Sequence, residues 1–106
     1  MLSFYLLADE VPKPRPTQVA ELLPAGQLSE ESFTQLQQAR LLESRLNYYT
    51  DFRWSSAAVQ VKLQLLLQRF PQLRPTATPT ATPEQQLLLI LLNASAQSFG
   101  IIALAD

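Results

Sequence analysis

The sequence predicts a mainly α-helical protein, in which an antiparallel helical hairpin is followed by a C-terminal apolar helix on a proline-rich spacer. Two segments, 29–51 and 55–70, combine helix-start residues with apolar residues at helical spacing. Few residues join them, so residues 29–70 are expected to form the hairpin, because short connections make consecutive helices antiparallel neighbours. A third segment, 84–106, is rich in Leu, which favours helix over strand. A chain of 106 residues is long enough for a single small domain, 1–106.

The first hairpin helix is expected to begin at Ser29, because Glu30 and Glu31 follow in the first turn, where the helix dipole favours acids. Glu43 lies three residues after Arg40, which predicts a surface ion pair on this helix. The apolar residues form two stripes: Leu42, Leu46 and Tyr49 on one, and Leu41, Tyr48 and Phe52 on the other. A helix on a single core needs one stripe, so two stripes predict contacts on both sides.

The second hairpin helix is expected to begin at Ser55 or Ser56 and to end before Pro71. One face carries apolar residues at helical spacing: Val59, Leu63, Leu66, Leu67 and Phe70. Beside it runs a row of uncharged amides, which consists of Gln60, Gln64 and Gln68, with Val61 and Leu65 beyond. This helix therefore has a second surface that is polar but almost free of charge.

Two proline-rich segments are expected to be extended. Residues 9–16 carry three prolines at alternate positions and predict a stiff connector. Residues 74–83 repeat Thr-Ala-Thr between prolines, which predicts a semi-rigid spacer that rises about 3.1 Å per residue. The length of this spacer would allow the last helix to reach a neighbouring subunit.

The C-terminal helix has a clear start signal. Thr82 is the expected N-cap, Pro83 suits the first helical position, and Gln85 completes a capping box. The helix is expected to run to about residue 99 and to continue to 105 with a weak point at Gly100. One stripe is expected to pack it against other helices: Leu87, Leu91, Ala94, Ser98 and Ile101.

Two other structures fit the apolar C-terminal region. An α+β protein with a small sheet formed by 2–7, 87–92 and 99–105 is the alternative to the helical fold. The uncharged run 87–105 also has about the length of a membrane span. Polar residues lie in the middle of that run, however, and no Lys, Arg, Trp or Tyr flanks it, so a membrane span is possible but not favoured.

The composition argues against catalysis, against metal or cofactor sites and against nucleic-acid binding. The chain has neither His nor Cys, which removes the commonest general base and metal ligands, so no catalytic residue, metal site or cofactor is predicted and the protein is not expected to be an enzyme. The net charge is −1, and scattered basic residues make nucleic-acid binding unlikely. The N-terminus lacks the features of a signal peptide, which predicts a cytoplasmic protein.

An aromatic cluster is the best candidate for a binding site. It consists of Tyr48, Tyr49, Phe52, Arg53 and Trp54, and residues of these types dominate binding hot spots. Aromatic residues of this kind also close hydrophobic cores, and aromatics with Arg stack on single-stranded nucleic acid. Closure of the core is the commoner role of such aromatics, and the cluster is the candidate partner-binding site if it lies at the surface. The sequence leaves these interpretations open.

The function predicted from these features is that of a non-catalytic helical interaction protein. Only 16% of the residues are charged, against about 25% in typical proteins, so its surfaces repel one another weakly. An accessory subunit, assembly factor or adaptor that packs its helices in a homo-oligomer or on a protein partner fits best. The alternatives are a small membrane-associated protein anchored by 87–105 and a single-stranded nucleic-acid binder that uses the 48–54 cluster.

Overall fold

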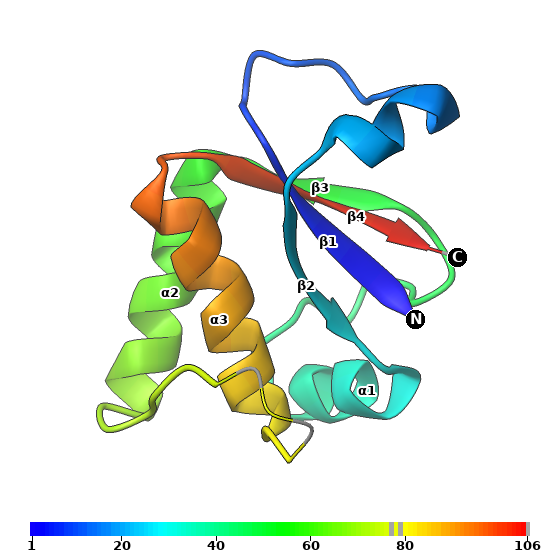
Figure 1. Cartoon of the computed structure of the whole chain (residues 1–106). Coiled ribbons are helices and arrows are strands. Elements are labelled where there is room, and N and C mark those ends of the chain that lie inside the picture. The colour runs from blue at the N-terminus through cyan, green and yellow to red at the C-terminus, as the bar shows by residue number, and fades with distance from the viewer. Residues whose placement is uncertain (77, 79, 106) are drawn as a thin grey trace.

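A computed structural model describes residues 1–76, 78 and 80–105, and within them the chain is an α+β protein (Figure 1). The elements in chain order are β1 (Leu2–Leu7), the 3-10 helix η1 (Pro16–Glu21), β2 (Pro24–Leu28), α1 (Glu30–Gln38), β3 (Phe52–Trp54), α2 (Ser56–Arg69), α3 (Pro83–Ala96) and β4 (Gly100–Ala105). The strands form one sheet in the order β2-β1-β4-β3, and all neighbours are antiparallel. Figure 1 shows α2 and α3 side by side on one side of this sheet, with η1 on the other.

The predicted mainly helical fold is wrong, because the C-terminal segment is not one helix. The chain turns sharply after Ala96, where Ser98 adopts a left-handed conformation (φ 58°) and the Phe99 N–H donates to the Ala94 carbonyl. Residues 100–105 then pair with β1 along its whole length. The α+β alternative was closer, since 2–7 and 100–105 are strands, but its middle segment 87–92 lies in α3.

The predicted hairpin of two long helices is also wrong. Helix α1 ends at Gln38, where Arg40 is left-handed (φ 61°) and the Leu41 N–H donates to the Leu36 carbonyl. This hydrogen bond closes a Schellman turn, the same device that ends α3. The two apolar stripes arose because residues after Arg40 reach the core from a loop, where helical spacing has no meaning. Helix α2 packs along α3 and not along α1.

The predicted helix starts are confirmed. The side chains of Ser29, Ser55 and Thr82 each accept a hydrogen bond from a backbone N–H three residues further along. At α3 the Gln85 side chain also accepts from the Thr82 N–H at 3.0 Å, which completes the capping box. These local signals were readable because a cap depends on only four consecutive residues.

The core lies between the sheet and the helices. Leu2, Phe4 and Leu6 alternate along β1 and point to the helical side, and all three are buried in the core. The same face of β4 contributes Ile101, which has no exposed surface. Burying a side chain of this size stabilises the fold by about 1.5–3 kcal/mol.

The opposite face of the sheet is crossed by the 8–23 connector. Arg53 donates to the Ala8 carbonyl at 2.8 Å, and Lys13 forms an ion pair with Asp51 at 2.9 Å. Ala8 follows the end of β1, whereas Asp51 accepts a hydrogen bond from the N–H of Ala105, which lies opposite the start of β1. The connector therefore runs along the length of the strands. Ile102 points to this face and is 2% exposed, so the connector is part of the fold as well as a spacer.

Two predicted segments extend beyond the described residues. Residues 77 and 79 of the 74–83 spacer and residue 106 of the predicted 84–106 helix lie outside them. In the part of the chain that is described, no helix has both the length and the hydrophobicity needed to span a membrane, and α3 has 14 residues.

Replacing Ser98 by Gly should stabilise the protein. Gly adopts the left-handed conformation without the steric cost that a Cβ brings, so we expect the free energy of unfolding to rise by about 0.5–1 kcal/mol. Urea denaturation of Ser98→Gly beside the wild type measures this. A loss of stability would show that the turn after α3 has another geometry.

Replacing Gly100 by Ala should destabilise the protein by about 2 kcal/mol, because the added methyl group overpacks the sheet. A Cβ at Gly100 would lie 2.5 Å from the Trp54 backbone oxygen and 3.2 Å from that of Leu7. These oxygens belong to the strands on either side of β4, so neither can move away cheaply. Urea denaturation is again the measurement, and wild-type stability of Gly100→Ala would contradict the central place of β4.

Candidate functional site

The aromatic cluster runs from the surface into the core. The Tyr49 ring is 5.2 Å from that of Tyr48, and Phe52 lies 5.4 Å from Trp54. Phe33 joins the two pairs, and Phe4 contacts both Phe52 and Trp54. The rings therefore stack mainly on one another.

Exposure divides the five cluster residues. Tyr49 is 68% exposed and its hydroxyl donates to Glu30, whereas Trp54 is 4% exposed. Tyr48 and Phe52 are half-buried against the core. Arg53 is exposed on the connector side of β3, away from its aromatic neighbours. A partner would meet Tyr49 and Arg53 on different surfaces, and the partner-binding role of the cluster stays a prediction.

The five residues predicted to pack the C-terminal helix lie in different elements. Leu87, Leu91 and Ala94 face inward from α3 and are fully or almost fully buried. Ile101 is buried in β4, and Ser98 is exposed in the turn between them. The inward stripe of α3 thus packs on the chain's own sheet.

The outer face of α2 carries no formal charge. Val59, Leu63 and Leu66 point inward. Lys62, Leu65 and Arg69 lie on the flank next to α1, and the outer face is formed by the exposed residues away from that flank. The exposed residues of this outer face are Ala57, Gln60, Val61, Gln64, Leu67 and Gln68. Val61 is 55% exposed and Leu67 37%. The Gln60 amide donates to the Ser95 hydroxyl at 2.8 Å, so the face continues onto α3, where Leu92 and Ala96 are uncharged as well.

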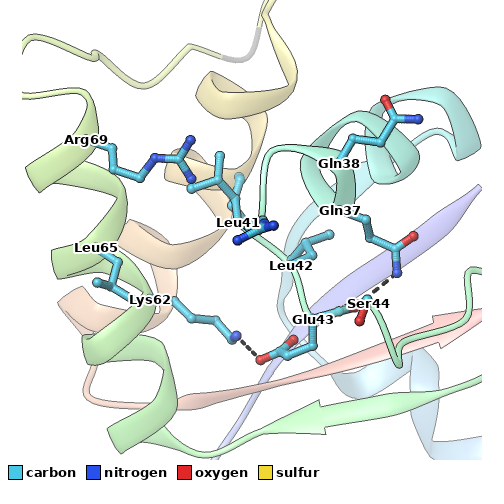
Figure 2. A pocket seen from close by; sticks show the side chains of 11 residues that line it. Gln37, Gln38, Leu41, Leu42, Glu43, Ser44, Lys62, Leu65 and Arg69 are labelled. Carbon is cyan, nitrogen blue, oxygen red and sulfur yellow. Dashed lines mark hydrogen bonds and ion pairs between the residues drawn. The ribbon is translucent and has the colours of Figure 1, made fainter.

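A cleft of about 730 Å³ opens beside α2, on the flank next to α1 (Figure 2). Gln37 and Gln38 come from α1, and Lys62, Leu65 and Arg69 come from α2. The other lining residues belong to the 40–44 loop and to α3: Arg40, Leu41, Leu42, Glu43, Ser44 and Leu87. The loop is fixed by Gln37, which donates to the carbonyls of Glu43 (3.0 Å) and Leu46 (2.8 Å).

An ion pair between Lys62 and Glu43 links α2 to the 40–44 loop across the cleft (Figure 2). The Lys62 side chain is 13% exposed, and its ammonium group lies 4.7 Å from the centre of the Trp54 ring. Glu43 was expected to pair with Arg40, but this pairing assumed a helix through residue 43. The pair now joins the 40–44 loop to α2 and places a cation on the only Trp of the chain.

Three acidic side chains that link loops to neighbouring elements are stabilised in their charged form: Asp9, Glu43 and Asp51. Burial alone would raise the pKa of Glu43, but hydrogen bonds from Lys62 and the backbone, with the charges of Lys62 and Arg45, hold it below its usual value of 4.5. Hydrogen bonds from the Ser56 hydroxyl and N–H lower the pKa of Asp9. A hydrogen bond from Lys13 and one from the Ala105 N–H lower the pKa of Asp51. These carboxylates bind loops, strands and α2 together.

Sequence reasoning missed the cleft. Residues 40–44 were assigned to a helix that runs from 29 to 51, so the loop that lines the cleft opposite Lys62 was not predicted. No local signal marks Lys62 as the partner of Glu43, because the two are brought together by tertiary packing alone. The left-handed Arg40 was equally hidden, since Gly is the usual residue at that position.

No known protein family, curated protein or solved structure matches this chain. The function is therefore inferred from the geometry of the chain's own surfaces.

Replacing Lys62 by Met should destabilise the protein by about 2 kcal/mol at pH 7, because the mutation leaves the partly buried Glu43 charge without its partner. Among the described residues the Glu43 Oε2 atom already has no hydrogen-bond partner. The lowered pKa of Glu43 means that the stabilisation is present above pH 4.5 and is lost as the pH falls through the folded-state pKa. The difference between variant and wild type should therefore shrink below pH 4.5, as measured by denaturation at several pH values.

The same substitution at Lys13 is the matched control. Lys13 is 62% exposed in its ion pair with Asp51, so Lys13→Met should cost less than about 1 kcal/mol. Equal losses for the two variants would argue against a special role of the Lys62–Glu43 pair.

Proposed function

We propose that this chain is a non-catalytic interaction protein that associates with a second copy of itself through the outer face of α2 and α3. The observation that carries the proposal is the absence of charge from the exposed residues of that face, Ala57, Gln60, Val61, Gln64, Leu67 and Gln68. Because an isologous dimer brings the same surface together twice, any charge near its axis would meet its own copy.

The chemistry of the face suits contact with an identical surface. An amide both donates and accepts hydrogen bonds, so each Gln can pair with a Gln of another copy. Val61 and Leu67 add exposed apolar area, which favours burial. A partner with a strongly charged surface would find no opposite charge here, which is why a second copy is the occupant that we favour.

The two alternatives have less support. Single-stranded nucleic acid needs exposed rings for stacking, and Tyr49 is the largely exposed ring of the 48–54 cluster. A membrane anchor at 87–105 would need a continuous span, whereas this segment forms most of α3 and then β4. The cytoplasmic location, and a choice among accessory subunit, assembly factor and adaptor, stay predictions.

Replacing Gln64 by Glu should weaken self-association. The substitution keeps the side-chain size and places a carboxylate in the middle of the face, so two copies would oppose like charges. We expect the dissociation constant of the dimer to rise about tenfold or more, as measured by analytical ultracentrifugation over a concentration series. A mixture of Gln64→Glu and Gln64→Lys should restore the dimer.

Gln18→Glu provides the control, because Gln18 is exposed on η1, on the other side of the sheet. It should leave association unchanged. A wild-type protein that stays monomeric at every concentration would refute the proposal, as would equal effects of the two Glu variants.

A further inference from the structure

The cleft between α1 and α2 has the size of a small-molecule site. Its volume is about 730 Å³, and sites for small ligands typically have about 300–1,000 Å³. Figure 2 shows Lys62, Leu65 and Arg69 on one wall, with Gln37 and Gln38 across from them. The Gln37 amide donates to two loop carbonyls and fixes the 40–44 loop to α1.

The cleft is basic, although the chain carries a net charge of −1. Arg40, Lys62 and Arg69 line it against a single acid, Glu43. Since Lys62 is paired with Glu43, the positive charges of the two arginines remain uncompensated. The cleft therefore attracts an anion.

The two arginines have hydrogen-bond donors to spare. Arg69 donates to the Ala39 carbonyl, which uses one of the five N–H groups of a guanidinium. The backbone N–H of Arg40 donates to the Gln37 carbonyl, but its guanidinium forms no hydrogen bond or ion pair within the described part of the chain. Guanidinium groups match the geometry of carboxylate and phosphate oxygens, which they bind with two parallel hydrogen bonds.

Besides Gln37, Gln38 and Ser44, the uncharged lining of the cleft is apolar. Leu65 is 52% exposed at the cleft wall, and Leu41 and Leu87 also line the cleft. An inorganic anion would leave this surface in water, whereas a ligand with a hydrocarbon body would cover it.

We propose that the cleft binds a small amphipathic anion, whose carboxylate or phosphate monoester head is held by Arg40 and Arg69 and whose apolar body lies on Leu41 and Leu65. The site is separate from the charge-free outer face of α2. Its occupation therefore does not depend on self-association.

The test is a titration of the isotopically labelled protein followed by NMR, with octyl phosphate and octanoate as separate probes. At least one probe should shift the backbone signals of 37–44 and 62–69 in a saturable way, and the probe that binds identifies the head group. The indole signal of Trp54 should move too, because Lys62 lies over its ring. Octanol and inorganic phosphate should each bind about tenfold more weakly or worse, since each lacks one half of the ligand.

Two glycine variants separate binding from stability. Arg40→Gly removes the guanidinium and also relieves a left-handed residue, so it should weaken the binding about tenfold or more without lowering the melting temperature. Ser98→Gly makes the same backbone change at the end of α3 and should leave the affinity unchanged. The proposal is overturned if neither probe binds, if octanol binds as tightly as the anions, if the shifts fall outside the cleft, or if Arg40→Gly binds like the wild type.

Discussion

The pairing of β4 with β1 on one side and β3 on the other is the interaction on which the rest of this structure depends. It joins the two ends of the chain, with Leu2 opposite Ala105 and Leu7 opposite Gly100. Strand β4 lies between β1 and β3, so the chain must leave α3 and turn into the sheet before Gly100. The left-handed Ser98 makes that turn. The sheet forms its core face only when residues 100–105 have paired with β1 and β3. The fold therefore depends on contacts between distant parts of the sequence.

Local signals in the sequence predicted local features well. The caps at Ser29, Ser55 and Thr82 depend on neighbouring residues, and the structure contains them. Most of the predicted apolar face of α2 also points inward, but Leu67 is exposed on the outer face. The main prediction continued the helix through 100–105, and only the α+β alternative placed a strand there. The residues continue the apolar spacing of α3, and a buried strand and a buried helix look alike in a short apolar run. The end of α1 was missed because Arg40 stands where Gly usually marks the turn.

The two surfaces proposed for function follow from the way α2 is packed. The inward residues of α2 contact the sheet and α3. The outer face of α2 carries the uncharged Gln row, and the side next to α1 contributes Lys62, Leu65 and Arg69 to the cleft. The Gln row was visible in the sequence, since it needs only helical spacing. The cleft needs the 40–44 loop to fold back on α2, which the Lys62–Glu43 ion pair and the Gln37 hydrogen bonds secure.

The most direct test of the central place of β4 is an NMR measurement of backbone chemical shifts and amide hydrogen exchange over 96–105. The structure predicts helical shifts that stop at Ala96 and extended shifts from Gly100. It also predicts that the amides of Ile101, Ile102 and Ala103, which lie between two strands, exchange at the rate of global unfolding. Helical shifts that continue through Ile101, together with fast exchange of these amides, would contradict the fold described here.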